Sequence, residues 1–448
     1  MAEAPSQFSG HGAELEPDLD RPAPHWTEPP SPYRPDMHAA AGQEAVAIDL
    51  SRYLDAAATS PPAPEVLAAM ATMAPRAWAN PSSLHGPGLV AAELLEISRI
   101  RLAAALGSEP SQLILCSGGS EAIHLALLGS AALMEPGRLL ISAVEHPATR
   151  AAAAQLQRQG WQLEILPVDR FGLVDPVTLA ERLAPPTRLV SLIWGQSEVG
   201  SLQPLASLGA LCRVAGVRLH VDAVQVVGHQ PINLAQLPVD LLSCTAHKLQ
   251  GPRGVGALAL APGVELAPLI GGGSQEGGRR GGTEPVLLAH GFAEALDLAT
   301  TRLAAAGGRD PVAPLRDELW QRLRQRPGLR LSGPEPDGGA RRLPHHLSLL
   351  VAADDGRPLS GRALVRALAC RGWAVSSGSA CSSGGTAWDS GASGAASPIL
   401  LAMGFGEREA ASGLRLSLGP WLKPEDLERF PDDLDSARRE LQGLESGA

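Results

Sequence analysis

The chain has 448 residues and a mass of 46.4 kDa, with 44% hydrophobic residues, which is enough for a large core and two lobes. Its formal net charge of −10 argues against a nucleic-acid or anionic-membrane binder, because such proteins need a basic patch. Five cysteines without zinc spacing argue against a disulfide framework or a metal site, and no apolar run is long enough to cross a bilayer. We therefore expect a cytoplasmic protein that binds no metal.

Residues 1–47 carry eight prolines, many acidic residues and no periodic apolar pattern, which predicts a disordered acidic tail. From Ile48 onward, short apolar segments alternate with Ala/Leu-rich amphipathic stretches. This alternation predicts an α/β fold with a mostly parallel sheet and helices on both faces. The expected strands are Gln112–Cys116, Leu139–Ala143, Gln162–Pro167, Leu189–Ile193, Val217–Val221 and Val239–Ser243, and the expected helices include Leu89–Leu106 and Ala122–Leu133.

A smaller α+β C-terminal domain is expected over residues 307–448, after a large domain over residues 48–306. Its predicted elements are a helix at Pro314–Arg324, a strand at Leu347–Val351 and a helix at Gly361–Arg371. Residues 48–60, at the start of the large domain, can pack with the smaller domain instead. The Gly-rich stretch Gly271–Gly282 is predicted to be a flexible crossing between them.

The loops after the strands are where a parallel sheet binds its ligands. Gly119 and Ser120 follow the strand at Gln112–Cys116 and open a helix, where backbone N–H groups can bind an anion; an ordinary capped turn is the alternative. Asp222 ends another strand and can hold a buried cation or cap a helix. His146 follows a third strand, where it can stack on a planar ligand or have a purely structural role.

Lysine is almost absent from this chain: only Lys248 and Lys423 occur among 37 basic residues. Lysine can lose its proton and form an imine, whereas arginine stays protonated, so a retained lysine can have a role that arginine cannot fill. Thr245 and His247 lie next to Lys248 and can donate hydrogen bonds to an anion. An exposed loop lysine is the alternative interpretation.

Two further residues stand out near the C-terminus. Cys381 lies in the Gly/Ser/Ala-rich loop 376–397, where an accessible thiol is a candidate nucleophile or a surface cysteine of no consequence. The other four cysteines have apolar neighbours and are expected to fill the core. Arg415 lies among apolar residues and needs an anionic partner, either a substrate carboxylate or an internal acidic residue.

Together these residues resemble the cysteine desulfurases, which are fold-type-I pyridoxal 5'-phosphate (PLP) enzymes of the class-V aminotransferase group. The resemblance runs from Tyr53 to Gly419, and its most specific motif is Ser376-Ser377-Gly378-Ser379-Ala380-Cys381. It implies that PLP is the cofactor, that L-cysteine is converted to L-alanine, and that sulfur passes to an enzyme persulfide for iron–sulfur cluster or thio-cofactor assembly. It also implies a homodimer and a sulfur-acceptor or scaffold protein as partners.

The resemblance implies a role for each matching residue. Lys248 forms the imine with PLP and moves the Cα proton, Cys381 takes the substrate sulfur, and His146 stacks on the ring. The residues implied to bind the cofactor are Gly119, Ser120, His146, Ser197, Asp222, Gln225, Thr245, Ala246, His247, Lys248 and Thr283. The residues implied to bind the substrate are Asn80, Ser197 and Arg415.

Two features depart from the family pattern. Ser197 stands where the family usually has asparagine, and the loop after Cys381 is longer than in housekeeping desulfurases. A selenocysteine lyase or another class-V carbon–sulfur lyase is therefore one alternative. A PLP-fold sulfur-transfer partner or scaffold with little turnover is the other.

Overall fold

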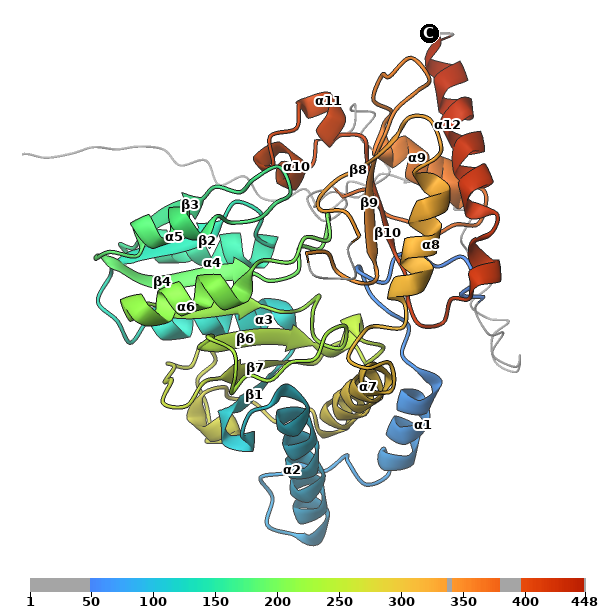
Figure 1. Cartoon of the computed structure of the whole chain (residues 1–448). Helices are drawn as coiled ribbons and strands as arrows, with labels where there is room; N and C mark the ends of the chain where they lie inside the picture. The colour runs from blue at the N-terminus through green and yellow to red at the C-terminus, as the bar shows by residue number, and fades with distance from the viewer. Residues whose placement is uncertain (1–48, 337–340, 379–395, 447–448) are drawn as a thin grey trace, which may run out of the picture. The chain divides into compact units, whose positions relative to one another are not determined.

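The computed structural model describes residues 49–336, 341–378 and 396–446. Leu50–Ala448 form one compact unit, which contains a seven-stranded sheet and a three-stranded sheet (Figure 1). The strands of the larger sheet are β1 (Leu113–Cys116), β2 (Arg138–Ser142), β3 (Gln162–Leu166), β4 (Thr187–Ile193), β5 (Arg218–Asp222), β6 (Leu241–Thr245) and β7 (Gly256–Leu260).

The larger sheet has the strand order β1-β7-β6-β5-β4-β2-β3. Strands β2 to β6 pair in parallel, whereas β7 runs antiparallel to both β1 and β6. The predicted α/β fold with a mostly parallel sheet is therefore confirmed, and all six expected strands are present. Strand β7 was missed because its sequence, Gly-Ala-Leu-Ala-Leu, lacks the β-branched and aromatic residues typical of strands.

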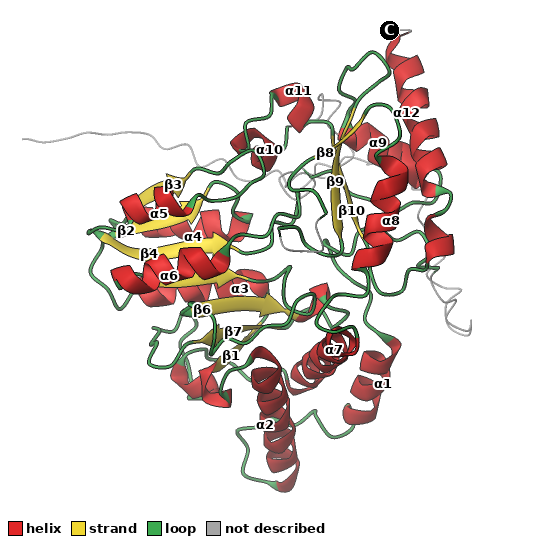
Figure 2. Cartoon of the chain, in the orientation of Figure 1, coloured by secondary structure: helices red, strands yellow, loops and turns green. Residues whose placement is uncertain are grey.

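Helices cover both faces of this sheet (Figures 1 and 2). The helices of the chain up to the end of α7 are α1 (Pro64–Met73), α2 (Gly86–Leu106), α3 (Gly119–His124), α4 (Pro147–Arg158), α5 (Pro176–Arg182), α6 (Leu205–Ala215) and α7 (Val286–Ala305). Successive side chains of a strand point to opposite faces. Leu140 accordingly belongs to the core under α5 and α6, and its neighbours Leu139 and Ile141 belong to the core under α3 and α4.

The Gly-rich stretch Gly271–Gly282 is not the crossing between two domains that its composition predicted. It leads into α7, which packs against α2 and α1 beside the larger sheet. A buried ion pair holds it in place: Arg99 donates to both oxygens of Glu276, at 2.7 and 2.8 Å, and Glu276 also accepts from the backbone N–H of Leu115. Composition alone could not reveal this pair, because its partners are 177 residues apart.

Replacing Glu276 with alanine should therefore destabilise the protein strongly. The Glu276 side chain is 1% exposed, and its loss leaves the Arg99 guanidinium, which is 12% exposed, with the more distant, solvent-exposed carboxylate of Glu96 at 3.6 Å. We expect the free energy of unfolding to fall by about 3–5 kcal/mol in denaturant titrations. Glu294→Ala is the matched control, because the pair between Glu294 and Arg101 is about a quarter exposed, and its loss should cost about 1 kcal/mol or less. Equal effects of the two changes would contradict this account.

The smaller sheet has the order β10-β9-β8 and is antiparallel. Its strands are β8 (Leu329–Leu331), β9 (His346–Val351) and β10 (Gly413–Ser417), and the helices around it and after it are α8 (Ala313–Leu323), α9 (Gly361–Ala369), α10 (Pro398–Ala402), α11 (Glu407–Ala410) and α12 (Phe430–Ser446). A separate hydrophobic cluster packs here and includes Leu54 from the N-terminal side of α1. The division at residue 307 stays a prediction.

None of the helices in the described residues has the length and apolar character that crossing a bilayer requires.

Candidate active site

A cavity of about 280 Å³ lies beyond the carboxyl ends of the parallel strands β2, β4, β5 and β6, the edge where such sheets bind ligands. Residues that follow these four strands form one side of it, and residues near β10 form the other. Its lining includes Ala57, Ala58, Glu145, His146, Gln196, Ser197, Glu198, Asp222, Val224, Gln225, Lys248, Ser376, Ser377, Gly378 and Arg415. The cavity thus joins segments from residue 57 to residue 415.

The amine of Lys248 reaches this cavity from a single 3-10 turn, Ala246–Lys248, that follows β6. Its Nζ donates to the backbone carbonyls of Ala57 and Ala58 at 2.5 and 2.7 Å. The buried carboxylate of Asp222 also acts electrostatically on this amine. Lysine, unlike arginine, can exchange its proton in catalysis.

Asp222 is the last residue of β5 and is 3% exposed. Burial raises the pKa of its carboxyl, and the nearby His146 and Lys248 lower it. One carboxylate oxygen accepts from the backbone N–H of Val224 at 3.0 Å, so Asp222 caps the following turn as well as lining the cavity. Gln225, three residues on, donates to the carbonyl of Ala57 at 2.9 Å.

His146 is the residue before α4 and accepts from the backbone N–H of Ala148 through Nδ1 at 3.1 Å. Burial lowers the pKa of this imidazole, while the negative charge of Asp222 raises it and the positive charge of Lys248 lowers it further. The net direction is downward, so the ring is neutral near pH 7. A neutral planar ring suits stacking on a flat ligand.

The sequence left two anionic partners open for Arg415, a substrate carboxylate or an internal acidic residue, and the structure is compatible with both. It lines the cavity, yet its guanidinium also donates to Asp55 at 2.7 Å and to the carbonyl of Ser197 at 3.1 Å. Its Nε is buried and has no hydrogen-bond partner among the described residues. The same Ser197 carbonyl also accepts from His346, at 3.0 Å. The internal acidic partner that the sequence left open is therefore Asp55.

Two carboxyl groups in the cavity were missed by sequence reasoning. Glu198 accepts from the hydroxyl of Ser397 at 2.7 Å, and burial raises its pKa to about 7 although Ser397 and Arg415 favour the charged form. Glu145 is 1% exposed and accepts from Ser142 and from the backbone N–H of Ile193. Glu198 follows Ser197 and Glu145 precedes His146, and both of these neighbours belong to predicted motifs. This adjacency was the signal in the sequence that could have pointed to the two carboxyl groups.

The buried carboxyl of Glu145 predicts how the stability of the protein depends on pH. Burial raises its pKa to about 8, from an ordinary 4.5, so between these values the folded protein keeps a proton that the unfolded chain has lost. The stability that this carboxyl contributes is therefore lost as the pH rises. Relative to Glu145→Gln, which does not titrate, the wild type should lose up to about 1.4 kcal/mol per pH unit between about pH 5 and pH 8. Denaturant titrations across this range measure the free energy of unfolding of both proteins. The same pH dependence in the two proteins would contradict the raised pKa of Glu145.

The remaining predicted cofactor residues lie outside the lining of the cavity. A side chain on Gly119, at the start of α3, would come within 2.7 Å of Val224, which does line it. Thr245 donates to the carbonyl of Val255, and His247 meets the hydroxyl of Thr59. Ala246 is buried, whereas Ser120 and Thr283 are exposed. Asn80, which was predicted to bind the substrate, is exposed as well.

Cys381 lies outside the described residues. Gly378, three positions before it, lines the cavity. Among the other cysteines, Cys116, Cys212 and Cys244 are buried as expected, but Cys370 is exposed. The expectation that Cys370 fills the core was wrong, because it follows α9 at a turn rather than lying on the helix's buried face.

Comparison with known proteins agrees with this arrangement. The model of the aminotransferase class-V family matches residues 52–430. A cysteine desulfurase IscS from Dictyoglomus turgidum is 36% identical over 395 residues, which cover 88% of this chain and 95% of the relative. Another, from Methanosarcina thermophila, is 33% identical and covers 91% of this chain and 97% of its own. The chain belongs to the cysteine desulfurase family.

Solved structures extend the comparison to this desulfurase's fold. A NifS-like protein superposes with a TM-score of 0.76 at 29% identity, covering 87% of this chain and 99% of its own. A structure described as SspA in complex with cysteine has a TM-score of 0.68 at 28% identity and covers 83% of this chain and 100% of its own. The expected family, fold-type-I fold and cysteine desulfurase function are thereby confirmed. Enzymes of this family use PLP.

Proposed function

We propose that this desulfurase holds PLP in the cavity, converts L-cysteine to L-alanine, and transfers the sulfur to Cys381 as a persulfide. One observation carries the proposal: an amine, a buried carboxylate and a guanidinium, from Lys248, Asp222 and Arg415, line the same cavity. Each matches a different charged or reactive group of the cofactor and the substrate.

The donor set of the cavity fits the cofactor. The amine of Lys248 suits its aldehyde, the buried carboxylate of Asp222 suits a protonated ring nitrogen, and the flat face of His146 suits its ring. The carboxamide of Gln225 can donate to its phenolic oxygen. Gly119 leaves open the space beside Val224 at a helix start, where backbone N–H groups favour a phosphate.

Bound PLP supplies an electron-withdrawing ring that stabilises negative charge on the substrate's α-carbon. The protein's own residues do the rest. Lys248 takes the α-proton and returns one, because its amine lines the cavity. Asp222 would hold a cationic ring nitrogen, and that ion pair would offset the cost of burying its carboxylate. His146, whose pKa is lowered by burial, would offer a neutral flat face to the ring.

The substrate carboxylate is proposed to bind Arg415. Its Nε has no partner among the described residues, and its Nη2 is paired with Asp55, which is itself partly exposed. The backbone carbonyl of Ser197 accepts a hydrogen bond from Arg415 and so orients the guanidinium. The short side chain of Ser197 can therefore act on the substrate. Asn80 remains a proposed substrate residue; it is exposed and does not line the cavity of a single chain.

Cys381 is proposed as the sulfur acceptor on the enzyme. Its α-carbon is three residues beyond Gly378, so chain geometry keeps the two within about 11 Å. The Cys381 thiolate attacks the substrate Sγ, and the bond between Sγ and Cβ breaks. The electron pair of that bond goes to Cβ, which takes a proton. One thiol and one cysteine thus become one persulfide and one alanine, without an external oxidant.

A side-by-side assay tests the proposal. The purified protein is given L-cysteine, L-selenocysteine or L-cysteine sulfinate, and alanine release is measured. We expect L-cysteine to be turned over and to leave a single peptide, the one with Cys381, heavier by one sulfur atom. Turnover of selenocysteine alone would instead identify a selenocysteine lyase, and a coloured protein that forms no alanine would identify a sulfur-transfer scaffold.

A homodimer is supported by large apolar side chains exposed along one stretch of the chain. Leu67, Trp78, Leu84 and Leu89 are 54–90% exposed, and they lie on α1, on the start of α2 and between the two helices. Isolated exposed apolar residues are common, whereas several large ones within one stretch of the chain favour an interface. Asn80 lies in the same stretch. Thr283 is also exposed, as is required of a residue that reaches the partner's cofactor phosphate. Sedimentation analysis should give twice the chain mass.

The persulfide sulfur is proposed to pass to an acceptor or scaffold protein for iron–sulfur cluster or thio-cofactor assembly. This role needs Cys381 as a free thiol between cycles. Because thiols stay reduced in the cytoplasm, we propose that compartment.

A further inference from the structure

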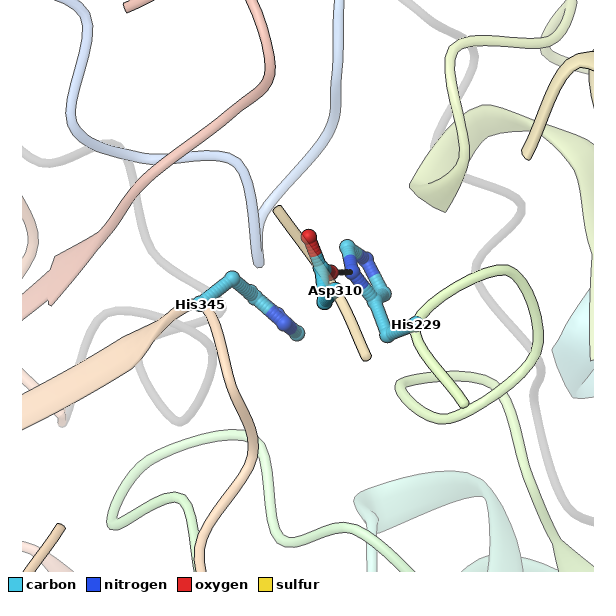
Figure 3. Close-up of side chains that lie close together, drawn as sticks. All are labelled: His229, Asp310 and His345. Carbon is cyan, nitrogen blue, oxygen red and sulfur yellow. Dashed lines mark hydrogen bonds and ion pairs between the residues drawn. The ribbon is translucent and has the colours of Figure 1, made fainter. Parts of the chain in front are cut away.

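Three side chains of the kinds that bind metals meet outside the cavity described above: His229, Asp310 and His345 (Figure 3). One imidazole nitrogen of each histidine and one carboxylate oxygen of the aspartate all lie within 4.8 Å of one another. His229 is in the turn-rich stretch after β5, Asp310 lies between α7 and α8, and His345 directly precedes β9. None of them was marked by sequence reasoning.

The cluster is tightly packed. His229 Nδ1 lies 2.6 Å from a carboxylate oxygen of Asp310, and the other oxygen accepts from the backbone N–H of Val312 at 2.9 Å. The rings of His229 and His345 stack with their centres 3.8 Å apart and their planes 23° from parallel. Figure 3 shows the His345 ring directed toward the other two side chains.

His345 supplies the independent observation that points to a ligand. It is 1% exposed, and its Nδ1 has no hydrogen-bond partner among the described residues. A buried polar nitrogen without a partner costs free energy, so such groups are rare and need an explanation. With the ring proton on Nε2, Nδ1 presents a lone pair that a bound cation would accept.

We propose that His229, Asp310 and His345 form a binding site for a divalent transition metal, represented by Zn²⁺. Two imidazoles and one carboxylate are the protein ligands of many open zinc sites, in which water completes the coordination. A pocket of about 360 Å³, which is lined by His229, Asp310 and Pro344 among others, provides room for that water.

Coordination requires a small rearrangement of the cluster. Zinc-to-ligand bonds of about 2.1 Å place neighbouring ligand atoms about 3.4 Å apart, closer than the present limit of 4.8 Å. The metal must also lie near the plane of each imidazole, so one of the stacked rings turns about χ2. That torsion is soft in histidine, which makes the movement inexpensive.

Neighbouring charges set an upper limit on the affinity. Arg316 is fully buried close to His345, and its guanidinium pairs with Asp317 at 2.6 Å. Arg302 lies near Asp310 and donates to the carboxamide of Gln250. Because both guanidiniums oppose a cation, we expect weaker binding than in a zinc site with four protein ligands.

A metal here would tie together three segments that are distant in sequence.

The test is a Zn²⁺ titration of the full-length, cofactor-loaded protein against a chromophoric chelator. All variants carry Cys381→Ser, so that this thiol cannot bind the metal. The parent should bind one Zn²⁺ per chain, and His229→Gln and Asp310→Asn should each weaken binding at least about tenfold. His290→Gln is the matched control, since His290 lies on α7 outside the cluster, and it should bind as the parent does.

X-ray absorption at the zinc edge should show nitrogen and oxygen ligands without sulfur. The proposal is overturned by an absence of saturable binding, by sulfur ligation, or by variants of His229 and Asp310 that bind like the parent. Asp310→Asn preserves the size of the side chain, so it guards against a variant that merely fails to fold. None of these readouts depends on desulfurase turnover, so this proposal and the proposed function fail separately.

Discussion

Replacing Lys248 with alanine is expected to abolish cysteine turnover and the visible absorbance of the bound cofactor together. No other described lysine reaches the cavity, and the amine there is both the group that can bond the cofactor aldehyde and the group that can move the α-proton. Loss of a positioned proton-transfer group alone costs about 10²–10⁴-fold in rate, and loss of covalent attachment adds to that. Alanine release and the absorption spectrum of the purified protein measure the two effects.

Lys423→Ala is a close control, because Lys423 is the one other lysine in the chain. It lies before the 3-10 turn Pro424–Leu427 and outside the cavity, so the variant should keep both its colour and its turnover. Borohydride reduction followed by peptide mapping gives a second measurement. Label on Lys423, or on no lysine, would show that the assignment of Lys248 is wrong.

Replacing Cys381 with serine is expected to separate cofactor binding from sulfur transfer. The groups that line the cavity are unchanged, so the variant should keep its colour and still respond spectrally to L-cysteine. It should accumulate no persulfide, because a serine hydroxyl is a far weaker nucleophile toward sulfur than a thiolate. We expect sustained alanine release to fall by at least about 10²-fold.

Cys370→Ser is the matched control for this change. Cys370 is the exposed cysteine of the described residues and lies after α9, outside the cavity, so it tests whether any accessible thiol suffices. The variant should turn over cysteine like the wild type. Normal turnover in Cys381→Ser, or a persulfide found on Cys370 in the wild type, would refute the assignment of Cys381.

Local pattern was sufficient to predict every strand of the larger sheet except β7. Apolar segments such as Leu189–Ile193 alternate with amphipathic helices, and that alternation is typical of a parallel sheet covered by helices. It also explains why Asp222, at the end of β5, and Lys248, in the turn after β6, lie on one cavity. The carboxyl ends of neighbouring parallel strands share an edge, so residues 26 positions apart in sequence meet there.

Tertiary packing alone decided which groups became partners. Arg415 lies 360 residues from Asp55, Arg99 lies 177 residues from Glu276, and the cluster of His229, Asp310 and His345 draws on three separate segments. Neither periodicity nor motif spacing carries information about such contacts, because they follow from how finished elements pack rather than from any local preference.

The sequence by itself determined six of the seven strands of the larger sheet, the membership in a family and the residues next to those strand ends. It could not determine the charge state of Glu198 or Glu145, because burial sets the pKa of a carboxyl and burial exists only after folding. The same reason explains the pairing of Arg415. A charged side chain takes whichever partner the folded chain brings within reach, and the fold brought Asp55.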